Sequence, residues 1–105
     1  MGLTLIESYS FARDSGRLWS QETRNQFLLF LSQNPNAGMV MPGSGGLRKL
    51  RWSLRSSGKR GGVRVIYFNR LNRGEIWLLA IYAKGDQETI TSDQLKGLKD
   101  ALKDL

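Results

Sequence analysis

The side chains that could do chemistry in this chain are mainly arginines and lysines, because it contains neither His nor Cys. Imidazole catalysis, thiol nucleophiles, disulfides and thiolate metal sites are therefore excluded. Nine of the sixteen basic residues lie between Arg48 and Arg73, inside a window from Asn25 to Gly74 that holds no Asp or Glu. Clustered cations without acids are typical of surfaces that bind phosphates. We hypothesise such a surface, with a plain solubility patch as the alternative.

The first group of candidate residues lies in the segment from Leu47 to Trp52. Side chains alternate across a β-strand, which places Lys49 and Arg51 on one face. Two cations at this spacing lie roughly 7 Å apart, close to the distance between successive phosphates of a single strand. The intervening Leu50 and Trp52 then face the other side, where we assign Trp52 to the core. A half-buried strand with a solvated outer face gives the same pattern.

A second group combines glycines with cations between Gly58 and Tyr67. Glycine lets a backbone approach a phosphate closely, and Lys59 and Arg60 lie among these glycines. Arg64 stands inside an otherwise apolar strand, where a cation is costly unless it pairs or reaches solvent. A guanidinium can bind a phosphate through two hydrogen bonds. We predict a phosphate contact for Arg64 and keep a structural ion pair as the alternative.

The third group is Tyr82 and Lys84, which share a face at the end of the last predicted strand. Other cations nearby would favour a neutral amine on Lys84, and a neutral amine can act as a base. An ordinary lysine at a strand end explains the same spacing. The glycine-rich run at residues 43–46 is not a P-loop, because the Gly-Lys-Ser/Thr ending is missing.

One α+β domain over residues 1–105 must position these groups. Alternating, β-branched or aromatic runs predict strands at residues 3–9, 47–53, 63–69 and 75–83. The last two are apolar on both faces, which predicts that they are central in the sheet. A polar stretch with Gly16 follows the first strand, and a helix then begins after Ser20 as N-cap and ends at Asn34. Residues 36–46 are predicted to be a loop.

The C-terminal helix has the clearest sequence signals. Thr91 and Gln94 form a predicted capping box. An apolar face that needs a sheet to cover it consists of Leu95, Leu98, Leu102 and Leu105. Gly97 weakens this helix by about 1 kcal/mol relative to alanine.

Charge and the N-terminal residues indicate the compartment and the partners. The formal net charge of +7 and the pI near 10.3 predict polyanionic partners, namely RNA, DNA or an acidic protein segment. The first ten residues carry Glu7 and no basic segment before a long apolar run. We therefore expect no signal peptide, no membrane contact and a cytoplasmic location. A metal site could use only carboxylates, which are few and scattered, so no metal is predicted.

Three ordered stretches of the sequence resemble the HigB branch of the RelE-like toxins. They are MPGSGGLRKLRW at residues 41–52, GKRGGVRVIY at 58–67, and LAIYAK at 79–84 followed by residues 91–98. The resemblance implies a RelE-like α+β fold, with an antiparallel-rich sheet of about four strands, N-terminal helices and a C-terminal helix. It also implies a ribosome-dependent endoribonuclease that cleaves messenger RNA in the decoding site. The implied partner is a cognate antitoxin of the HigA type, a helix-turn-helix repressor.

The resemblance also implies catalytic positions. Those that match the family's cations are Lys49, Arg51, Arg64 and Lys84. Arg64 matches the strand arginine that holds the scissile phosphate, and Lys84 matches the basic residue that closes the last strand. The RelE prototype has a second cation directly after that lysine and a tyrosine near the C-terminus. This chain instead has Gly85 and no tyrosine beyond Tyr82.

The chemistry of RNA cleavage fits this set of side chains. RNA carries its own nucleophile, the 2′-hydroxyl, so the protein must only align it, move protons and stabilise the phosphorane. We assign Arg64 and Arg51 to the phosphate and proton transfer to Lys49 or Lys84, favouring Lys49 because cations crowd it more. No cofactor is implied. Contacts to messenger or ribosomal RNA are predicted for Arg48, Arg55, Lys59, Arg60 and Tyr82. The alternative function is a basic nucleic-acid-binding module, or an inactive family member, without catalysis.

Overall fold

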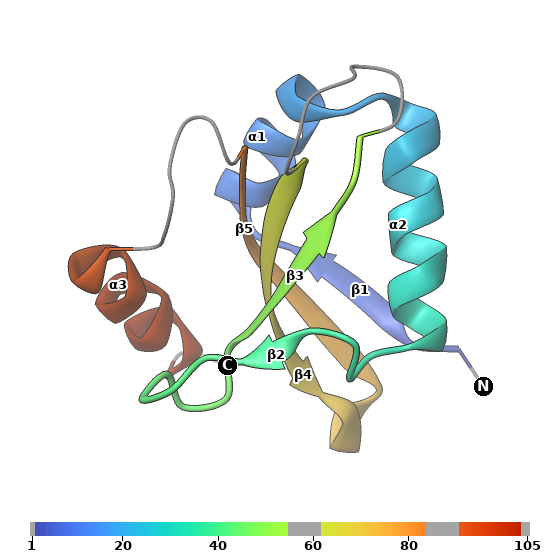
Figure 1. Cartoon of the computed structure of the whole chain (residues 1–105). Helices are drawn as coiled ribbons and strands as arrows, with labels where there is room; N and C mark the ends of the chain where they lie inside the picture. Colours follow the sequence, from blue (N-terminus) through green and yellow to red (C-terminus); the bar gives the residue numbers. More distant parts are fainter. Residues whose placement is uncertain (1, 55–61, 84–90, 104–105) are drawn as a thin grey trace.

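A computed structural model describes residues 2–54, 62–83 and 91–103 of the chain (Figure 1). The strands in these ranges are β1 (Thr4–Glu7), β2 (Met39–Val40), β3 (Arg48–Trp52), β4 (Val63–Arg70) and β5 (Glu75–Ala83). The helices are α1 (Tyr9–Leu18), α2 (Gln21–Gln33) and α3 (Ser92–Leu102), and the 3-10 turn η2 (Leu71–Arg73) joins β4 to β5. No helix in the described ranges combines the length and the apolar character needed to cross a membrane.

The strands form one mixed sheet in the order β1-β5-β4-β3-β2. Neighbouring strands are antiparallel except β1 and β5, which are parallel. The predicted central placement of β4 and β5 is confirmed. The predicted count of about four strands is one too low, because Met39 and Val40 pair with Lys49 and Arg48 inside the segment predicted as a loop. A strand of two residues is too short to show the alternation of apolar and polar residues by which a strand is predicted from sequence.

Helix α1 replaces the polar stretch that the sequence predicts after the first strand. Its N-cap is Ser8, whose Oγ accepts a hydrogen bond from the Phe11 amide at 3.0 Å. Phe11 and Ser15 lie one turn apart and are both buried. Gly16 is exposed on this helix and disguises the pattern, since glycine disfavours helix interiors. The predicted first strand accordingly ends at Glu7.

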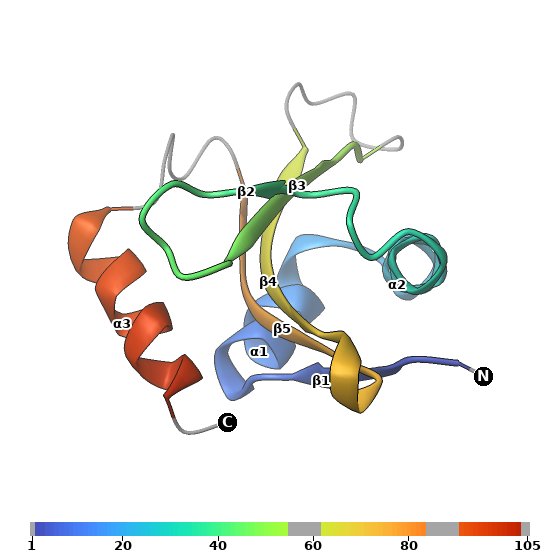
Figure 2. The ribbon, with the colours of Figure 1, turned by 90° about the horizontal axis from the view of Figure 1, so that it is seen from below.

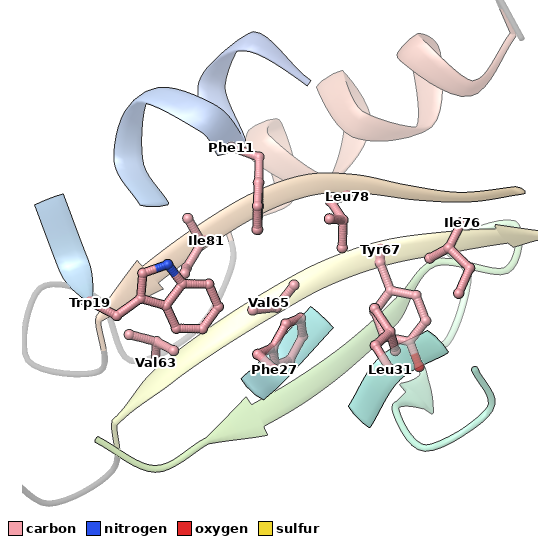
Figure 3. Packing of buried hydrophobic residues seen from close by; sticks show 10 residues of the cluster. All are labelled: Phe11, Trp19, Phe27, Leu31, Val63, Val65, Tyr67, Ile76, Leu78 and Ile81. Carbon is pink, nitrogen blue, oxygen red and sulfur yellow. The ribbon is translucent and has the colours of Figure 1, made fainter. Parts of the chain in front are cut away.

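The larger core lies between one face of the sheet and helices α1 and α2 (Figure 3). Phe11, Trp19 and Phe27 contribute rings from the helical side, and Trp19 and Phe27 have ring centroids 5.3 Å apart. Phe27 also meets Trp52 of β3 at 5.2 Å in an edge-on contact, which confirms that Trp52 belongs to the core. The cluster's sheet residues are Val63, Val65, Tyr67, Ile76, Leu78 and Ile81.

Helix α3 lies across the sheet from α2 (Figure 2) and packs on the opposite face. The capping box predicted at its start is confirmed, because Thr91 and Gln94 exchange side-chain and backbone hydrogen bonds. Its apolar residues Leu95, Leu98 and Leu102 cover a smaller cluster of Leu47, Ile66 and Leu79. Leu105, predicted on the same face, lies outside the described residues. Lys99 also ties the helix to the glycine-rich loop, since its Nζ donates to the Gly43 carbonyl at 2.8 Å.

A β-bulge interrupts the pairing of β4 with β5. Tyr67 pairs with Leu78 but the preceding Ile66 pairs with Ala80, so Leu79 is an extra residue in β5. Leu79 and Ala80 consequently both contact the α3 side, whereas Leu78 and Ile81 belong to the larger core on the other side. Beyond the bulge, every β5 side chain points to the face opposite the one that strict alternation would give.

Candidate nucleic-acid interface

A row of three side chains crosses the sheet at the α3 face. Arg51 of β3 lies directly opposite Arg64 of β4, and Arg64 lies directly opposite Tyr82 of β5. Arg51 is exposed, and the other two are half-buried. Like charges directly opposite each other destabilise a sheet. A bound anion between Arg51 and Arg64 would turn this repulsion into attraction, and two guanidiniums can share the oxygens of one phosphate.

Lys49 lies on the same face, one row along the strand. Its cross-strand neighbours are Ile66 and, on β2, Met39. The predicted alternation of Lys49 and Arg51 against Leu50 and Trp52 is thus confirmed. The ion pairs found among the described residues involve neither Lys49 nor Arg51; they join Arg13 and Arg17 to Asp14, Arg24 to Glu7, and Lys103 to Asp100. This part of the surface therefore keeps its positive charge.

Tyr82 joins the row only because of the bulge in β5. If Leu79 paired regularly with Ile66 instead of forming the bulge, the register from Tyr67 and Leu78 would set Ile81 opposite Arg64. The Tyr82 hydroxyl is buried and has no hydrogen-bond partner among the described residues. Burial raises the pKa of Tyr82 above its ordinary value, and the nearby Arg64 charge opposes this shift only partly. The hydroxyl is therefore neutral at physiological pH, with a proton to donate.

Two clefts flank the row, one at each end. At the Tyr82 end, a cleft of about 310 Å³ runs between β5 and α3, and Asp14 of α1 also lines it. At the Arg51 end, a second cleft of about 310 Å³ lies between the end of β3 and α2, lined by Thr23, Gln26 and Trp52 besides Arg51.

Arg48 lies apart from the other candidates, on the face that carries the larger core. It pairs with the buried Tyr67, and its Nη1 donates to the Gly38 carbonyl at 2.6 Å and to the Asn36 carbonyl at 3.3 Å. The Tyr67 hydroxyl binds the same loop by donating to the Pro35 carbonyl and accepting from the Gly38 amide, both at 2.8 Å. The structure thus shows Arg48 holding the α2–β2 loop. Its predicted contact with RNA remains a prediction.

Several predicted residues lie outside the described part of the chain. They are Lys84, Arg55, Lys59 and Arg60. Sequence reasoning conversely missed Asp14 and Gln94, which reach the cleft at Tyr82 from two different helices. Within residues 2–54, 62–83 and 91–103, no three acidic side chains come together as metal ligands would. The chemistry that this surface offers is the binding of negative charge by Arg51, Arg64 and Lys49.

Comparison with known proteins adds one finding on the fold. No family model matches the sequence. Among solved structures, the chain is similar to the E. coli toxin RelE, in a variant with two arginines replaced by alanine and in the free state. The TM-score is 0.64 with 19% sequence identity, over 93% of this chain and 99% of that one. The chain has the RelE fold. The predicted RelE-like α+β architecture is therefore confirmed, with five strands instead of about four.

Proposed function

We propose that this protein is the toxin of a type II toxin-antitoxin system, and that it cleaves messenger RNA on the ribosome and so inhibits translation. The observation that carries the proposal is the opposed pair of Arg51 and Arg64 on the open part of the α3 face. The RelE fold supports it, because the similar solved protein is a toxin. The acid-free stretch of the sequence from Asn25 to Gly74 supports it independently.

In the proposed reaction the 2′-oxygen of the RNA attacks the adjacent phosphorus, and the bond from phosphorus to the 5′-oxygen of the next nucleotide breaks. Arg64 and Arg51 bind the non-bridging oxygens and stabilise the charge of the phosphorane. One group must take the proton of the 2′-hydroxyl and one must protonate the leaving 5′-oxygen. We assign these steps to Lys49 and Lys84 and favour Lys49, which shares its face with Arg51, as the base.

The proposed partners follow from the same surface. Messenger RNA would lie along the row from Arg51 to Tyr82, and ribosomal RNA would contact the basic residues around it. The inhibitor would be a cognate antitoxin, which we propose to be a helix-turn-helix protein of the HigA type. With a net charge of +7, the toxin should associate with acidic surfaces quickly and in a salt-dependent manner.

The test is toeprinting of a defined messenger on purified ribosomes, with and without the protein, alongside induced expression in cells without an antitoxin. We expect new messenger ends within the decoding site and growth arrest. Arg73→Ala is the matched control for Arg64→Ala, because Arg73 belongs to the same basic stretch but lies in the turn at the opposite end of β4 from Arg64. Intact messenger together with harmless expression would contradict the proposal and favour a binding module without catalysis.

A further inference from the structure

The cleft at the Tyr82 end of the row has the size and the lining of a small-ligand site. Its volume of about 310 Å³ is at the lower end of the range for such sites. Its walls come from three elements: β5 supplies Ala80, Ile81 and Tyr82, α3 supplies Gln94, Gly97 and Leu98, and α1 supplies Asp14. Residues 94, 97 and 98 have the i, i+3, i+4 spacing of one helix face, so α3 turns a continuous stripe towards the cleft.

We propose that this cleft binds one unpaired nucleobase of the RNA whose phosphate lies on Arg64 and Arg51. The inference rests on the proposed function and specifies the substrate, since it adds a base-binding subsite to a phosphate-binding row. Proteins that bind single-stranded RNA take up splayed bases between apolar side chains and bind the base edges by hydrogen bonds. Ala80 and Leu98 supply the apolar contacts here, and Tyr82 and Asp14 supply the polar ones.

The polar groups of the cleft can bind the edge of a base. Hydrogen bonds from Arg13 and Arg17 hold the pKa of the Asp14 carboxyl below its usual range, so it is an ionised acceptor whose charge the two arginines balance. A carboxylate accepts hydrogen bonds from the amino groups of bases. The Tyr82 hydroxyl, buried and without a partner among the described residues, can donate to a ring nitrogen or a carbonyl oxygen of a base.

Gly97 is the second sign that the cleft accommodates a ligand. A glycine inside a helix costs about 1 kcal/mol relative to alanine. Close packing does not explain it, because a Cβ placed on Gly97 would meet no heavy atom within 4 Å. The space that a side chain would fill belongs to the cleft, which Gly97 lines. A glycine at this position therefore keeps the cleft open at the expense of helix stability.

The position of the cleft matches the dimensions of a nucleotide. Tyr82 and Arg64 are direct cross-strand neighbours, so their Cα atoms lie roughly 5 Å apart. A phosphate on Arg64 would thus be one strand away from the cleft that Tyr82 lines. This separation is of the order of the distance between the phosphate and the base of a single nucleotide.

The deciding variant is Gly97→Leu, which fills the cleft and also removes the glycine from the helix. In single-turnover cleavage on ribosomes, we expect the toxin concentration for half-maximal rate to rise about tenfold or more, with unchanged thermal stability or a higher melting temperature. Gly16→Leu is the matched control, because Gly16 is likewise an exposed helix glycine with open space at its Cβ but does not line the cleft. Cleavage by Gly97→Leu indistinguishable from that of the wild type would overturn the inference.

Binding to the free protein separates this inference from the proposed function. The probes are 2′-O-methyl RNA trinucleotides, which cannot be cleaved because their 2′-oxygen is blocked. In NMR titrations we expect them to shift the methyl signals of Ala80 and Leu98, and inorganic phosphate to leave those signals unchanged. Tyr82→Phe should weaken trinucleotide binding about three- to tenfold. Equal methyl shifts with phosphate alone, or none with any trinucleotide, would refute the base site even if ribosomal cleavage occurs. Shifts with trinucleotides but no cleavage would retain the base site and refute the endoribonuclease.

Discussion

The two faces of the sheet in this protein differ in how completely they are covered. Helices α1 and α2 bury ten residues on one face, including four aromatic side chains. On the other face, the cluster that α3 covers among the described residues buries Leu47, Ile66 and Leu79, and nearby strand positions carry Lys49, Arg51 and Arg64. The difference indicates that one face supplies most of the apolar burial that drives folding, and that the other leaves strand positions for basic side chains.

The first test of this difference removes a large side chain from the covered face, which is the face under α1 and α2. Phe27 is fully buried and contacts both Trp19 and Trp52. Phe27→Ala should lower the free energy of unfolding by about 3–5 kcal/mol, because it leaves a cavity between α2 and the sheet. Chemical denaturation measures the change. A loss below 1 kcal/mol would show that the covered face does not dominate stability.

The second test removes a charge from the open face. Arg64→Ala should lower ribosome-dependent cleavage on the order of 10²-fold, as expected when a group that stabilises a transition-state charge is lost. The fold should be retained, since the substitution removes no large apolar side chain from either core cluster. Cleavage kinetics and denaturation of the same sample measure both quantities. Wild-type toxicity of this variant would rule out a phosphate role for Arg64.

The third test concerns Arg48, which belongs to the basic stretch but to the covered face. Arg48→Ala removes the charged hydrogen bonds to the carbonyls of Gly38 and Asn36, so unfolding should become easier by about 1–2 kcal/mol. Cleavage per folded molecule should change little. If stability is unaffected and RNA binding becomes weaker and less salt-dependent, the RNA contact predicted from the sequence is the correct role.

The smallest expected effect appears at alkaline pH. Burial raises the pKa of both Tyr67 and Tyr82, one on each face of the sheet. The unfolded chain loses these protons near pH 10, before the folded protein does, so stability should be constant below that pH and should fall as the pH rises towards the folded pKa values. Absorbance of tyrosinate and denaturation at pH 9–11 measure this. In Tyr67→Phe and Tyr82→Phe, the alkaline loss should become smaller.

The sequence predicted the parts of this arrangement that depend on local patterns. Alternation placed Lys49 and Arg51 on one face, and hydroxyl caps located the starts of α2 and α3 at Ser20 and Thr91. Helix α1 was missed because Gly16 obscures its short apolar pattern. The opposition of Arg51 and Arg64 depends on strand register, and the approach of Asp14 to Tyr82 depends on how α1 packs. Neither is encoded within a local window, so neither could be predicted.

The bulge at Leu79 has a consequence for comparing this chain with its relatives. Because β5 gains one residue there, the alternation of side chains between the two faces of the sheet shifts by one position at Leu79. A relative that lacks the extra residue would carry, one place earlier along β5, the side chain that faces the arginine row. Alignments that allow no gap in the middle of β5 would then match Tyr82 with a core residue. Deleting Leu79 would mimic such a relative: Ala80 would follow Leu78 directly, and Tyr82 would stay opposite Arg64 in an uninterrupted ladder.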